Sequence, residues 1–434
     1  MRASIIVLSW NAMNDLRECL DALRAQDFTD VEIIVVDNGS TDGSADFVAR
    51  DYPDVNLIRN ERNVGFAAGN NQGLQHATGD VLVLLNQDTV VRAGWLKALV
   101  EALLSDPQCG IAGGKALYPD GRIQHAGGYV DERGAGSHYG YRQRDVGQFE
   151  QTREVDYVTG ATLAISRKAF EVIGALDEGF TPAYYEDVDW CYRTKASGLK
   201  VIYTPHAVLV HKESSAAAGS SHEQMYRFHR NRLRFVLKHW SAERLLGGFL
   251  PAEQDWLNGL GEGGEQLIAA IHHAYLYQLL HLSDLTEWRT STPGALQDEA
   301  DALAAVLLTL RAIAPLAPGR KAWTDVWVDA LSELRQREAI REERVPSRIP
   351  VVGRILTAFR HLWNRAVTAS YVLPMAHQQT EFNTRVVNVL EQLAQDRRFA
   401  VLSEYLSENG RELGTLAREL GQLRALVEKQ GPRD

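Results

Sequence analysis

The chain has 434 residues, of which 45% are hydrophobic and 24% are charged; this composition fits two or three globular domains and excludes a disordered chain or a membrane-helix bundle. The formal net charge of -10 argues against a general nucleic-acid-binding protein. Cys19, Cys109 and Cys191 are far apart and odd in number, so we expect buried, reduced thiols and a cytoplasmic protein.

The first half of the chain, from Ser4 to about Lys212, alternates short β-branched runs with amphipathic segments. This pattern is typical of βαβ units around a mainly parallel sheet. We expect no signal peptide and no spanning helix, because neither a leader nor a long apolar run is present. Asn14 is expected to cap a first helix, and Trp95–Ser105 to form another. The expected strands are Ser4–Trp10, Glu32–Asp37, Asn56–Asn60, Val81–Asn86, Val155–Ile165 and Val201–Val210.

A polar, glycine-rich segment, Asp131–Glu154, interrupts this pattern and resembles a functional lid. After Ser214 the tract SSAAAGSS is typical of a linker, and the rest of the chain is helical in pattern. We therefore expect an α/β domain over residues 1–215, a helical domain over 216–345 and an amphipathic tail over 346–434.

The tail carries a leucine seam from Phe399 onward, with spacings that alternate between three and four over about four heptads. This favours a coiled coil that joins copies of the chain into a homo-oligomer, and the alternative is an ordinary packed helix. Ile349–Met375 and Arg227–Lys238 mix basic and apolar residues, which predicts peripheral contact with the inner face of an anionic membrane.

Polar residues follow several expected strands, at the edge where ligands bind in open α/β sheets. Asp37 is placed to accept hydrogen bonds from a base or ribose, or to serve only as a turn residue. The glycines of Asn63–Gly73 allow a helix N-terminus to face phosphate, or simply allow close packing. Asp88 and His211 are candidate ligands of Mg²⁺ or Mn²⁺, although a strand-end Asp is also a common helix cap.

The most unusual feature is Tyr184–Trp190, where three acids occur within four residues beside aromatic side chains. Aromatic surroundings raise a carboxylate pKa by desolvation and offer stacking surfaces to sugar rings. The cluster therefore predicts a general base, and the alternative is an acidic helix N-terminus.

Taken together, these residues resemble glycosyltransferase family 2, in particular its bacterial rhamnosyltransferase-like branch, over about residues 4–240. The resemblance implies a GT-A fold, with Asp187 as catalytic base beside Glu186. It implies a metal held by Asp88 and His211, with Asn86 in place of the first acid of a D-x-D motif. The matching motifs are Ser4–Asn11, VVDNGSTDGS at Val35–Ser44, RNVGFAAGNNQG at Arg62–Gly73, LLNQD at Leu84–Asp88, VTGATLAISR at Val158–Arg167, YYEDVDWCYR at Tyr184–Arg193 and HKES at His211–Ser214.

The resemblance also assigns residues to the two substrates. Thr159, Gly160 and Trp190 are expected to contact the acceptor. The nucleotide-sugar is expected to contact Ser9, Trp10, Asn11, Asp37, Asn63, Gly65, Asn70 and Asn86.

The implied reaction is a single in-line displacement with inversion, in which Asp187 takes the acceptor proton as a nucleoside diphosphate departs. The donor is expected to be a nucleoside-diphosphate sugar, with dTDP-rhamnose favoured. The acceptor is expected to be a glycan or lipid-linked hydroxyl in cell-surface polysaccharide synthesis. One alternative is a sugar nucleotidylyltransferase, but Leu8–Asn11 lacks its glycine-rich phosphate loop. The other is an inactive scaffold that acts through its helical tail, against which the intact Asp88 and Asp187 weigh.

Overall fold

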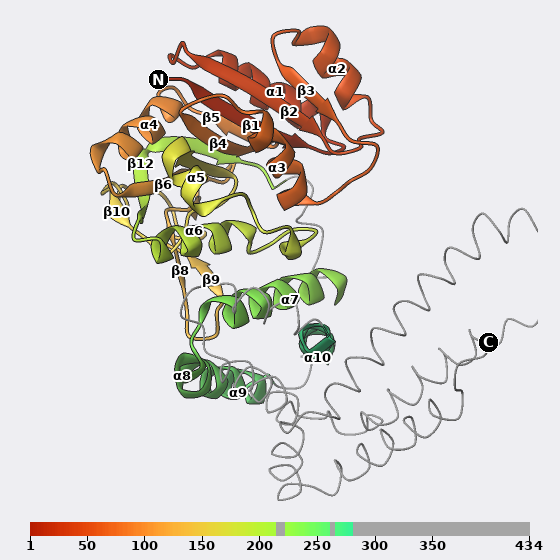
Figure 1. Cartoon of the computed structure of the whole chain (residues 1–434), viewed down its shortest axis with the longest axis vertical. Helices are drawn as coiled ribbons and strands as arrows, with labels where there is room; N and C mark the ends of the chain where they lie inside the picture. Colours follow the sequence, from red (N-terminus) through yellow and green to blue (C-terminus); the bar gives the residue numbers. More distant parts are fainter. Residues whose placement is uncertain (214–221, 261–264, 281–434) are drawn as a thin grey trace, which may run out of the picture. The chain divides into compact units, whose positions relative to one another are not determined.

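A computed structural model describes residues 1–213, 222–260 and 265–280 (Figure 1). Contacts divide the chain into one compact unit of residues 1–314 and a second of residues 315–434. The expected coiled coil and amphipathic tail lie outside the described residues and stay predictions, as do the boundaries expected near residues 215 and 345. None of the described helices has the length and hydrophobicity that a membrane span requires.

The described part of the unit is built on a mixed ten-stranded sheet with the order β10-β12-β6-β11-β4-β1-β2-β3, to which β5 and β7 add at β12 and β6. The strands β3, β2, β1 and β4 run parallel, β12 runs parallel to β6, and β11 is antiparallel to both neighbours. The bounds are β1 Ala3–Ser9, β2 Val31–Asp37, β3 Asn56–Arg59, β4 Val81–Asn86, β5 Thr89–Val91, β6 Cys109–Leu117, β7 Ile123–His125, β10 Arg153–Glu154, β11 Thr162–Ser166 and β12 Lys200–His211.

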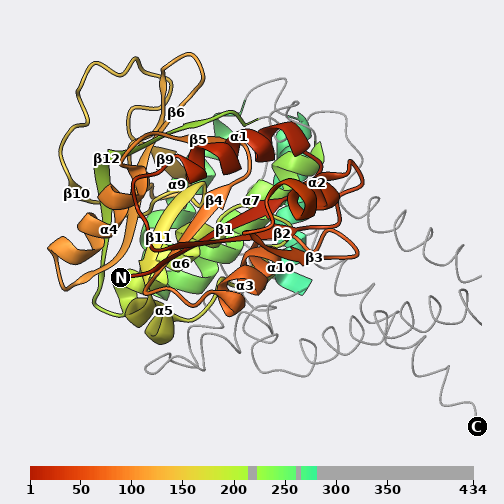
Figure 2. The same ribbon diagram turned by 90° about the horizontal axis from the view of Figure 1, so that it is seen from above.

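Helices cover both faces of the sheet (Figure 2), which explains why β1 and β4 are continuous apolar runs rather than alternating ones. One apolar core joins the sheet to α1 Met13–Arg24, α2 Ser44–Asp51 and α4 Trp95–Ser105. A second core joins it to α3 Phe66–His76, α5 Arg167–Ile173 and α6 Glu186–Ala196.

The second core continues into the segments beyond the expected linker. Leu233, Phe235, Val236 and Leu237 of α7 are buried in this core, together with residues of the helices that follow. The compact unit therefore includes helices on both sides of residue 215. The bounds are η1 Glu178–Phe180, α7 His222–His239, α8 Ala242–Arg244, η2 Leu245–Phe249, α9 Leu250–Asn258 and α10 Glu265–Leu280.

Most expected elements are present, and three expectations need correction. Asn14 does not cap α1, because Ala12 is the N-cap and Asp42 accepts the Met13 N–H at 3.0 Å. The strand expected over Val155–Ile165 begins only at Thr162. The expected lid contains part of a short hairpin, β8 Gly128–Val130 with β9 Gly136–His138, as well as β10. The three cysteines are free and buried, as expected.

Candidate active site

The carboxyl ends of β1, β2 and β4 bring the first group of expected residues together. Ser9 pairs with Asp37 across β1 and β2, and the next strand places Asn86 beside Leu8. The backbone of Trp10 is held on both sides by Gln87, whose Oε1 accepts the Trp10 N–H at 2.9 Å and whose Nε2 donates to the Trp10 carbonyl at 3.1 Å. Trp10 remains 45% exposed at this edge, where a planar base can stack on its indole ring.

Two buried polar atoms at this edge are ready to bind a ligand. Asp37 is 3% exposed, and its Oδ2 accepts the Ser40 N–H at 3.1 Å. Its Oδ1 and the Oγ of Ser9 are buried and have no hydrogen-bond partner among the described residues. Buried polar atoms are nearly always paired in a folded protein, so these two fit the donors and acceptors of a ribose or base.

The loop before α3 is organised by Asn38 together with residues that were expected to bind the donor. The Nδ2 of Asn38 donates to Asn63 Oδ1 at 3.1 Å and to the Gly65 carbonyl at 3.2 Å. Gly65 has a φ of 93°, which favours glycine at the start of α3. Asn70 is buried and donates to the Phe66 carbonyl within its own helix. Asn63, Gly65 and Asn70 therefore shape this loop and helix.

A hollow of about 460 Å³ also lies along this loop and α3, but it includes none of the residues around Asp88 or Asp187. Asn11 lies in the neighbouring turn and accepts the Thr41 N–H with its side chain at 2.8 Å.

Asp88 and His211 are brought together by the pairing of β12 with β5, which sets His211 opposite Thr89. The Nε2 of His211 lies 3.2 Å from Asp88 Oδ1 and 3.3 Å from Asn86 Nδ2. The side-chain Oε1 of Gln124 lies 2.7 Å from Nδ1, which favours the tautomer that carries its proton on Nδ1 and leaves the Nε2 lone pair for a metal.

This arrangement fits a divalent cation. Two neighbouring ligands, each about 2.1 Å from an octahedral ion, lie about 3 Å apart, close to the separation of Asp88 and His211. In the part of the chain that the structure describes, no group of three or more His, Cys, Asp and Glu side chains could hold a metal. The other ligands would then be water and substrate oxygens, which is the usual way in which proteins bind Mg²⁺ with few carboxylates.

Asp187 lies at the start of α6, beside the Thr159–Ala161 loop. Its Oδ2 accepts the Gly160 N–H at 2.7 Å and its Oδ1 accepts the Val188 N–H at 2.8 Å. Burial raises the pKa of the Asp187 carboxyl, although the backbone N–H groups oppose this shift. A partly exposed carboxylate with a raised pKa is suited to accept a proton.

Glu186 differs sharply from its neighbour. It is 6% exposed, and its Oε2 has no hydrogen-bond partner among the described residues. Burial, followed by the charge of Asp187, raises the pKa of Glu186 well above its usual value. Burial disfavours the ionised form of Glu186 and keeps its carboxyl from an acceptor hydroxyl, so Asp187 is the better base.

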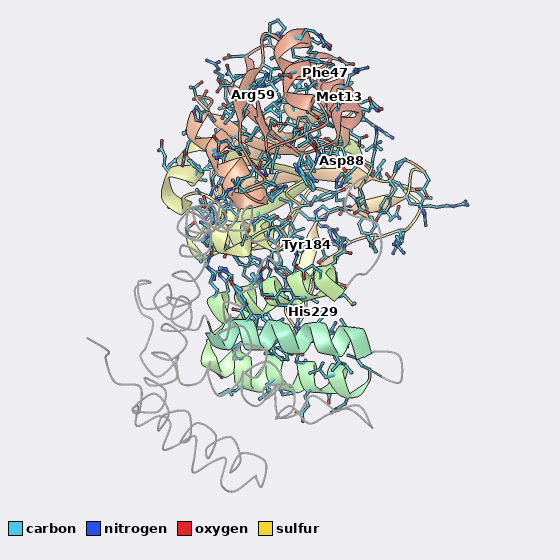
Figure 3. All side chains as sticks on the ribbon, turned by 90° about the vertical axis from the view of Figure 1, so that its right-hand side faces the viewer. Met13, Phe47, Arg59, Asp88, Tyr184 and His229 are labelled. Carbon is cyan, nitrogen blue, oxygen red and sulfur yellow. The ribbon has the colours of Figure 1, made fainter. Side chains whose placement is uncertain are left out.

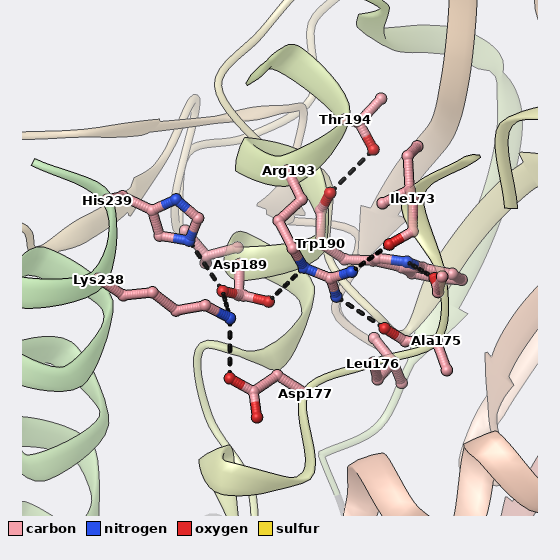
Figure 4. A network of polar contacts seen from close by, with 12 residues as sticks. Ile173, Ala175, Leu176, Asp177, Asp189, Trp190, Arg193, Thr194, Lys238 and His239 are labelled. Atoms are coloured by element: carbon pink, nitrogen blue, oxygen red, sulfur yellow. Dashed lines mark hydrogen bonds and ion pairs between the residues drawn. The ribbon is translucent and has the colours of Figure 1, made fainter. Parts of the chain in front are cut away.

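Asp189, the third acid of the cluster, belongs to a buried ion network that ties α6 to α7 (Figure 4). It is fully buried and contacts Arg193 Nε at 2.8 Å, Lys238 Nζ at 2.6 Å and His239 Nε2 at 2.8 Å. Burial alone would raise its pKa, but these partners hold the pKa of Asp189 far below its usual value. Lys238 also contacts Asp177 at 2.8 Å. Asp189 is therefore an ionised structural residue.

We expect Asp189→Asn to lower the free energy of unfolding at pH 7 by about 3 kcal/mol, because it leaves buried Lys238 without one of its compensating charges. An Asp whose folded pKa is depressed contributes stability above its unfolded pKa and loses it as the pH falls. The difference between variant and wild type should therefore shrink below about pH 4. Urea titration across pH tests this. Glu101→Gln, in an exposed pair with Lys97, is the control and should change little. An equally stable Asp189→Asn would contradict the assignment.

The two halves of the site are neighbours. The Asn86 N–H donates to the Ala161 carbonyl at 3.4 Å, and the same loop presents Gly160 to Asp187. The side chain of Thr159 accepts the Ala161 N–H at 3.3 Å and holds the loop. Trp190 was expected to contact the acceptor, but it is fully buried and its Nε1 donates to the Gly174 carbonyl at 2.9 Å, so it belongs to the core.

Two residues of the site were missed in the sequence. Gln124 and Gln87 hold His211 and Trp10, yet an amide side chain carries no signal of chemistry. Only their positions, in the short strand β7 and directly after β4, could have suggested a role.

The approach to Asp187 is strained. Tyr184 and Tyr185 have φ values of 84° and 73°, in the left-handed region that costs a residue with a side chain about 1–3 kcal/mol. Tyr185 also caps α6 without a side-chain hydrogen bond to the helix. Its hydroxyl donates instead to the Gly134 carbonyl at 2.8 Å. In Figure 3, Tyr184 lies between Asp88 and the helical layer that carries His229.

Comparisons with known proteins identify a family and several relatives to which this chain is similar. Residues 4–174 match the family described as Glycosyl transferase family 2. The O-antigen biosynthesis protein RfbC of Myxococcus xanthus is 32% identical over 225 residues, which are 50% of this chain and 18% of that protein. An N-acetylglucosaminyl-diphospho-decaprenol L-rhamnosyltransferase of Mycobacterium tuberculosis is 24% identical over 257 residues, which are 54% of this chain and 83% of that protein.

A solved structure of GalNAc-T7 with UDP, GalNAc and Mn²⁺ aligns with a TM-score of 0.47 at 18% identity, over 62% of this chain and 53% of that one. The chain spans only part of the first curated relatives that it matches. The matched region is 27% of an uncharacterised protein of Sinorhizobium fredii and 18% of RfbC.

Proposed function

The chain contains a glycosyl transferase family 2 domain over residues 4–174, and we propose that it is an inverting, metal-dependent glycosyltransferase. Its donor is a nucleoside-diphosphate sugar and its acceptor is a hydroxyl group. One observation carries the proposal. Among the described residues, Asp187 is the acid of its cluster that is partly exposed and makes no ion pair. The loop that holds it is hydrogen-bonded to Asn86, whose side chain contacts His211.

The residues of the chain divide the work of the reaction. The free Oδ1 of Asp37 and the Oγ of Ser9 bind the ribose or base, and Trp10 stacks on the base. A divalent cation between Asp88 and His211 would supply positive charge for the departing diphosphate. Asp187 takes the proton of the acceptor hydroxyl as its oxygen attacks the anomeric carbon. The backbone N–H of Gly160 keeps one carboxylate oxygen in place during this step.

No covalent sugar–enzyme intermediate is needed, because a single base and a single leaving group suffice for inversion. The proton moves from the acceptor to Asp187, and the electron pair of the broken bond stays on the diphosphate. A glycosidase would instead place two carboxylates on opposite sides of one glycosidic bond. Here the neighbouring acids Glu186 and Asp189 are both buried, and Asp189 is ion-paired.

The substrates are proposed at a finer level. Relatives that are named for O-antigen biosynthesis and for rhamnosyl transfer to a decaprenol-linked sugar support dTDP-rhamnose as donor and a glycan or lipid-linked acceptor in cell-surface polysaccharide synthesis. Thermal stabilisation by nucleoside diphosphates and nucleotide-sugars, with and without Mn²⁺, identifies the donor, since a bound ligand raises the melting temperature. Donor hydrolysis or transfer would exclude the inactive scaffold. Release of pyrophosphate from a nucleoside triphosphate and a sugar phosphate would favour the nucleotidylyltransferase.

We also propose a cytoplasmic enzyme that self-associates through its tail and contacts an anionic membrane peripherally. The heptad leucines and the basic stretches of the sequence support this. Light scattering should show an oligomer that dissociates when the chain is cut after residue 395, and the full chain should pellet with anionic liposomes. A full-length monomer would refute the first part, and absence from the pellet would refute the second.

A further inference from the structure

Helix α7 follows the family-matched region, yet it contacts the turn that leads to the proposed base. Asn231 of this helix is 1% exposed. Its Nδ2 lies 3.0 Å from the Phe180 carbonyl, 2.8 Å from the Ala183 carbonyl and 2.9 Å from the Tyr184 carbonyl. Its Oδ1 accepts from Arg230 Nε at 3.0 Å, so the partners on both sides determine the orientation of the amide. One buried side chain thus gathers three carbonyls of a single turn.

This turn contains the strained pair Tyr184–Tyr185. A left-handed residue with a side chain persists only where the surrounding contacts hold it, and two in succession need a strong restraint. The ring of Tyr185 packs on Phe228 and Phe235 of α7, with centroids 5.4 and 5.6 Å apart. The position of Asp187, two residues further along, depends on the direction in which this pair starts α6.

The same turn also contacts the donor half of the site. The Pro182 carbonyl accepts the Phe66 N–H at 2.7 Å, at the start of α3. A ring atom of Phe66 lies 3.3 Å from the position that a Cβ on Gly160 would take, and Gly160 is the residue that holds Asp187. The turn therefore joins the loop before α3 to the base.

We propose that Asn231 is a positioning residue for the transfer reaction. It holds the Tyr184–Tyr185 turn in its left-handed conformation and so keeps the Asp187 carboxylate on the Gly160 N–H, where it takes the acceptor proton. This inference rests on the proposed function. Attachment of α7 to the domain does not need Asn231, because Lys238 binds Asp177 and Asp189 two turns further along the helix. Loss of the Asn231 side chain should therefore alter the conformation of the Tyr184–Tyr185 turn and leave α7 packed on the domain.

The first test is Asn231→Ala in the full chain. We expect kcat to fall about 10- to 100-fold, because small displacements of a catalytic group cost this much. Donor affinity measured by calorimetry should stay within about two-fold, since the turn meets the donor half of the site through the Pro182 carbonyl, which Asn231 does not bind. The matched control is Gln278→Ala, which removes a buried amide that donates to the Arg230 carbonyl at 2.7 Å outside the turn. It should lower the melting temperature and leave kcat unchanged.

The second test compares Tyr184→Gly with Tyr184→Ala, which remove the same ring but differ in their tolerance of positive φ. In the Asn231→Ala background the glycine variant should be about five-fold more active than the alanine variant, because glycine adopts the turn without help. With Asn231 present, the two should be nearly equal. If Asn231→Ala does not fold, Asn231→Ser takes its place in the same comparison.

The outcomes separate the inference from the function on which it rests. A wild-type chain without turnover on any nucleotide-sugar refutes the proposed function, and this inference with it. An active wild type with an equally active Asn231→Ala refutes the inference alone. A loss of donor affinity in Asn231→Ala as large as the loss of kcat also refutes the inference. The same holds if the activity ratio of Tyr184→Gly to Tyr184→Ala is equal with and without Asn231.

Discussion

Asp187→Asn should keep its donor affinity and lose transfer activity by about two to four orders of magnitude. Asparagine has nearly the same shape, and its carbonyl oxygen still accepts the Gly160 N–H. It cannot take up the acceptor proton, so only the step that needs a base is lost. Calorimetric donor binding and a steady-state transfer assay, run on the same preparation, measure the two effects separately.

The neighbouring acids are the controls. Glu186→Gln should cost much less activity, because the carboxyl of Glu186 is buried and its raised pKa disfavours the ionised form that a base needs. Asp189→Asn should act mainly on stability, since its carboxylate is bound by Arg193, Lys238 and His239. An active Asp187→Asn together with an inactive Glu186→Gln would move the base one residue upstream.

The pH dependence and the stability of the variant follow from the same raised pKa. Transfer requires the ionised carboxylate, so kcat/KM should fall on the acidic side at a pH above about 4, the usual range of a carboxyl. A raised folded pKa means that ionisation of Asp187 costs folding free energy above the unfolded pKa. At neutral pH Asp187→Asn removes this cost, which offsets the hydrogen bond from the Val188 N–H that the amide nitrogen cannot accept, so the stability of the variant should stay close to that of the wild type. A less stable variant would indicate that the lost activity reflects damage to the fold.

The elements that sequence patterns predicted best are those with one dominant signal. Val81–Asn86 and Trp95–Ser105 have the expected bounds, because the first is a continuous apolar run and the second is strongly amphipathic. The strand β6 was missed. Its sequence, CGIAGGKAL, is rich in glycine and alanine, which have low strand propensity. A Cβ on Gly114 would lie 2.1 Å from the Ala207 carbonyl oxygen, so close packing selects the small residue.

The site was predictable where it depends on topology and unpredictable where it depends on burial. Residues that follow parallel strands meet at one edge, which is why Asp37 and Asn86 lie together as expected. Spacing cannot reveal that Glu186 and Trp190 are buried, because burial depends on packing against distant segments. Asn231 was missed for the same reason, since a lone amide in a basic helix gives no sign of three carbonyl partners far along the chain.

Removal of the divalent metal, or of its carboxylate ligand, is the second change with a large expected effect. Asp88→Ala should reduce transfer by about three orders of magnitude, because a departing diphosphate carries charge that the chain must otherwise leave uncompensated. A chelator should reduce wild-type transfer to the same level and should have little further effect on the variant. The mutation and the chelator both remove the same bound metal, so their effects on activity should not add.

Direct binding separates a metal ligand from a residue that merely supports the loop. Mn²⁺ binding, followed by electron paramagnetic resonance in the presence of nucleoside diphosphate, should be lost in Asp88→Ala and weakened in His211→Ala. Excess Mn²⁺ should restore part of the activity of His211→Ala, because Asp88 and the diphosphate oxygens still bind the ion. Gln124→Ala should lower the affinity for Mn²⁺ about 10- to 100-fold, since the Gln124 side chain holds the imidazole of His211 in the tautomer that exposes Nε2. If Asp88→Ala kept near-wild-type activity in the chelator, the assignments of Asp88 and His211 would both be wrong.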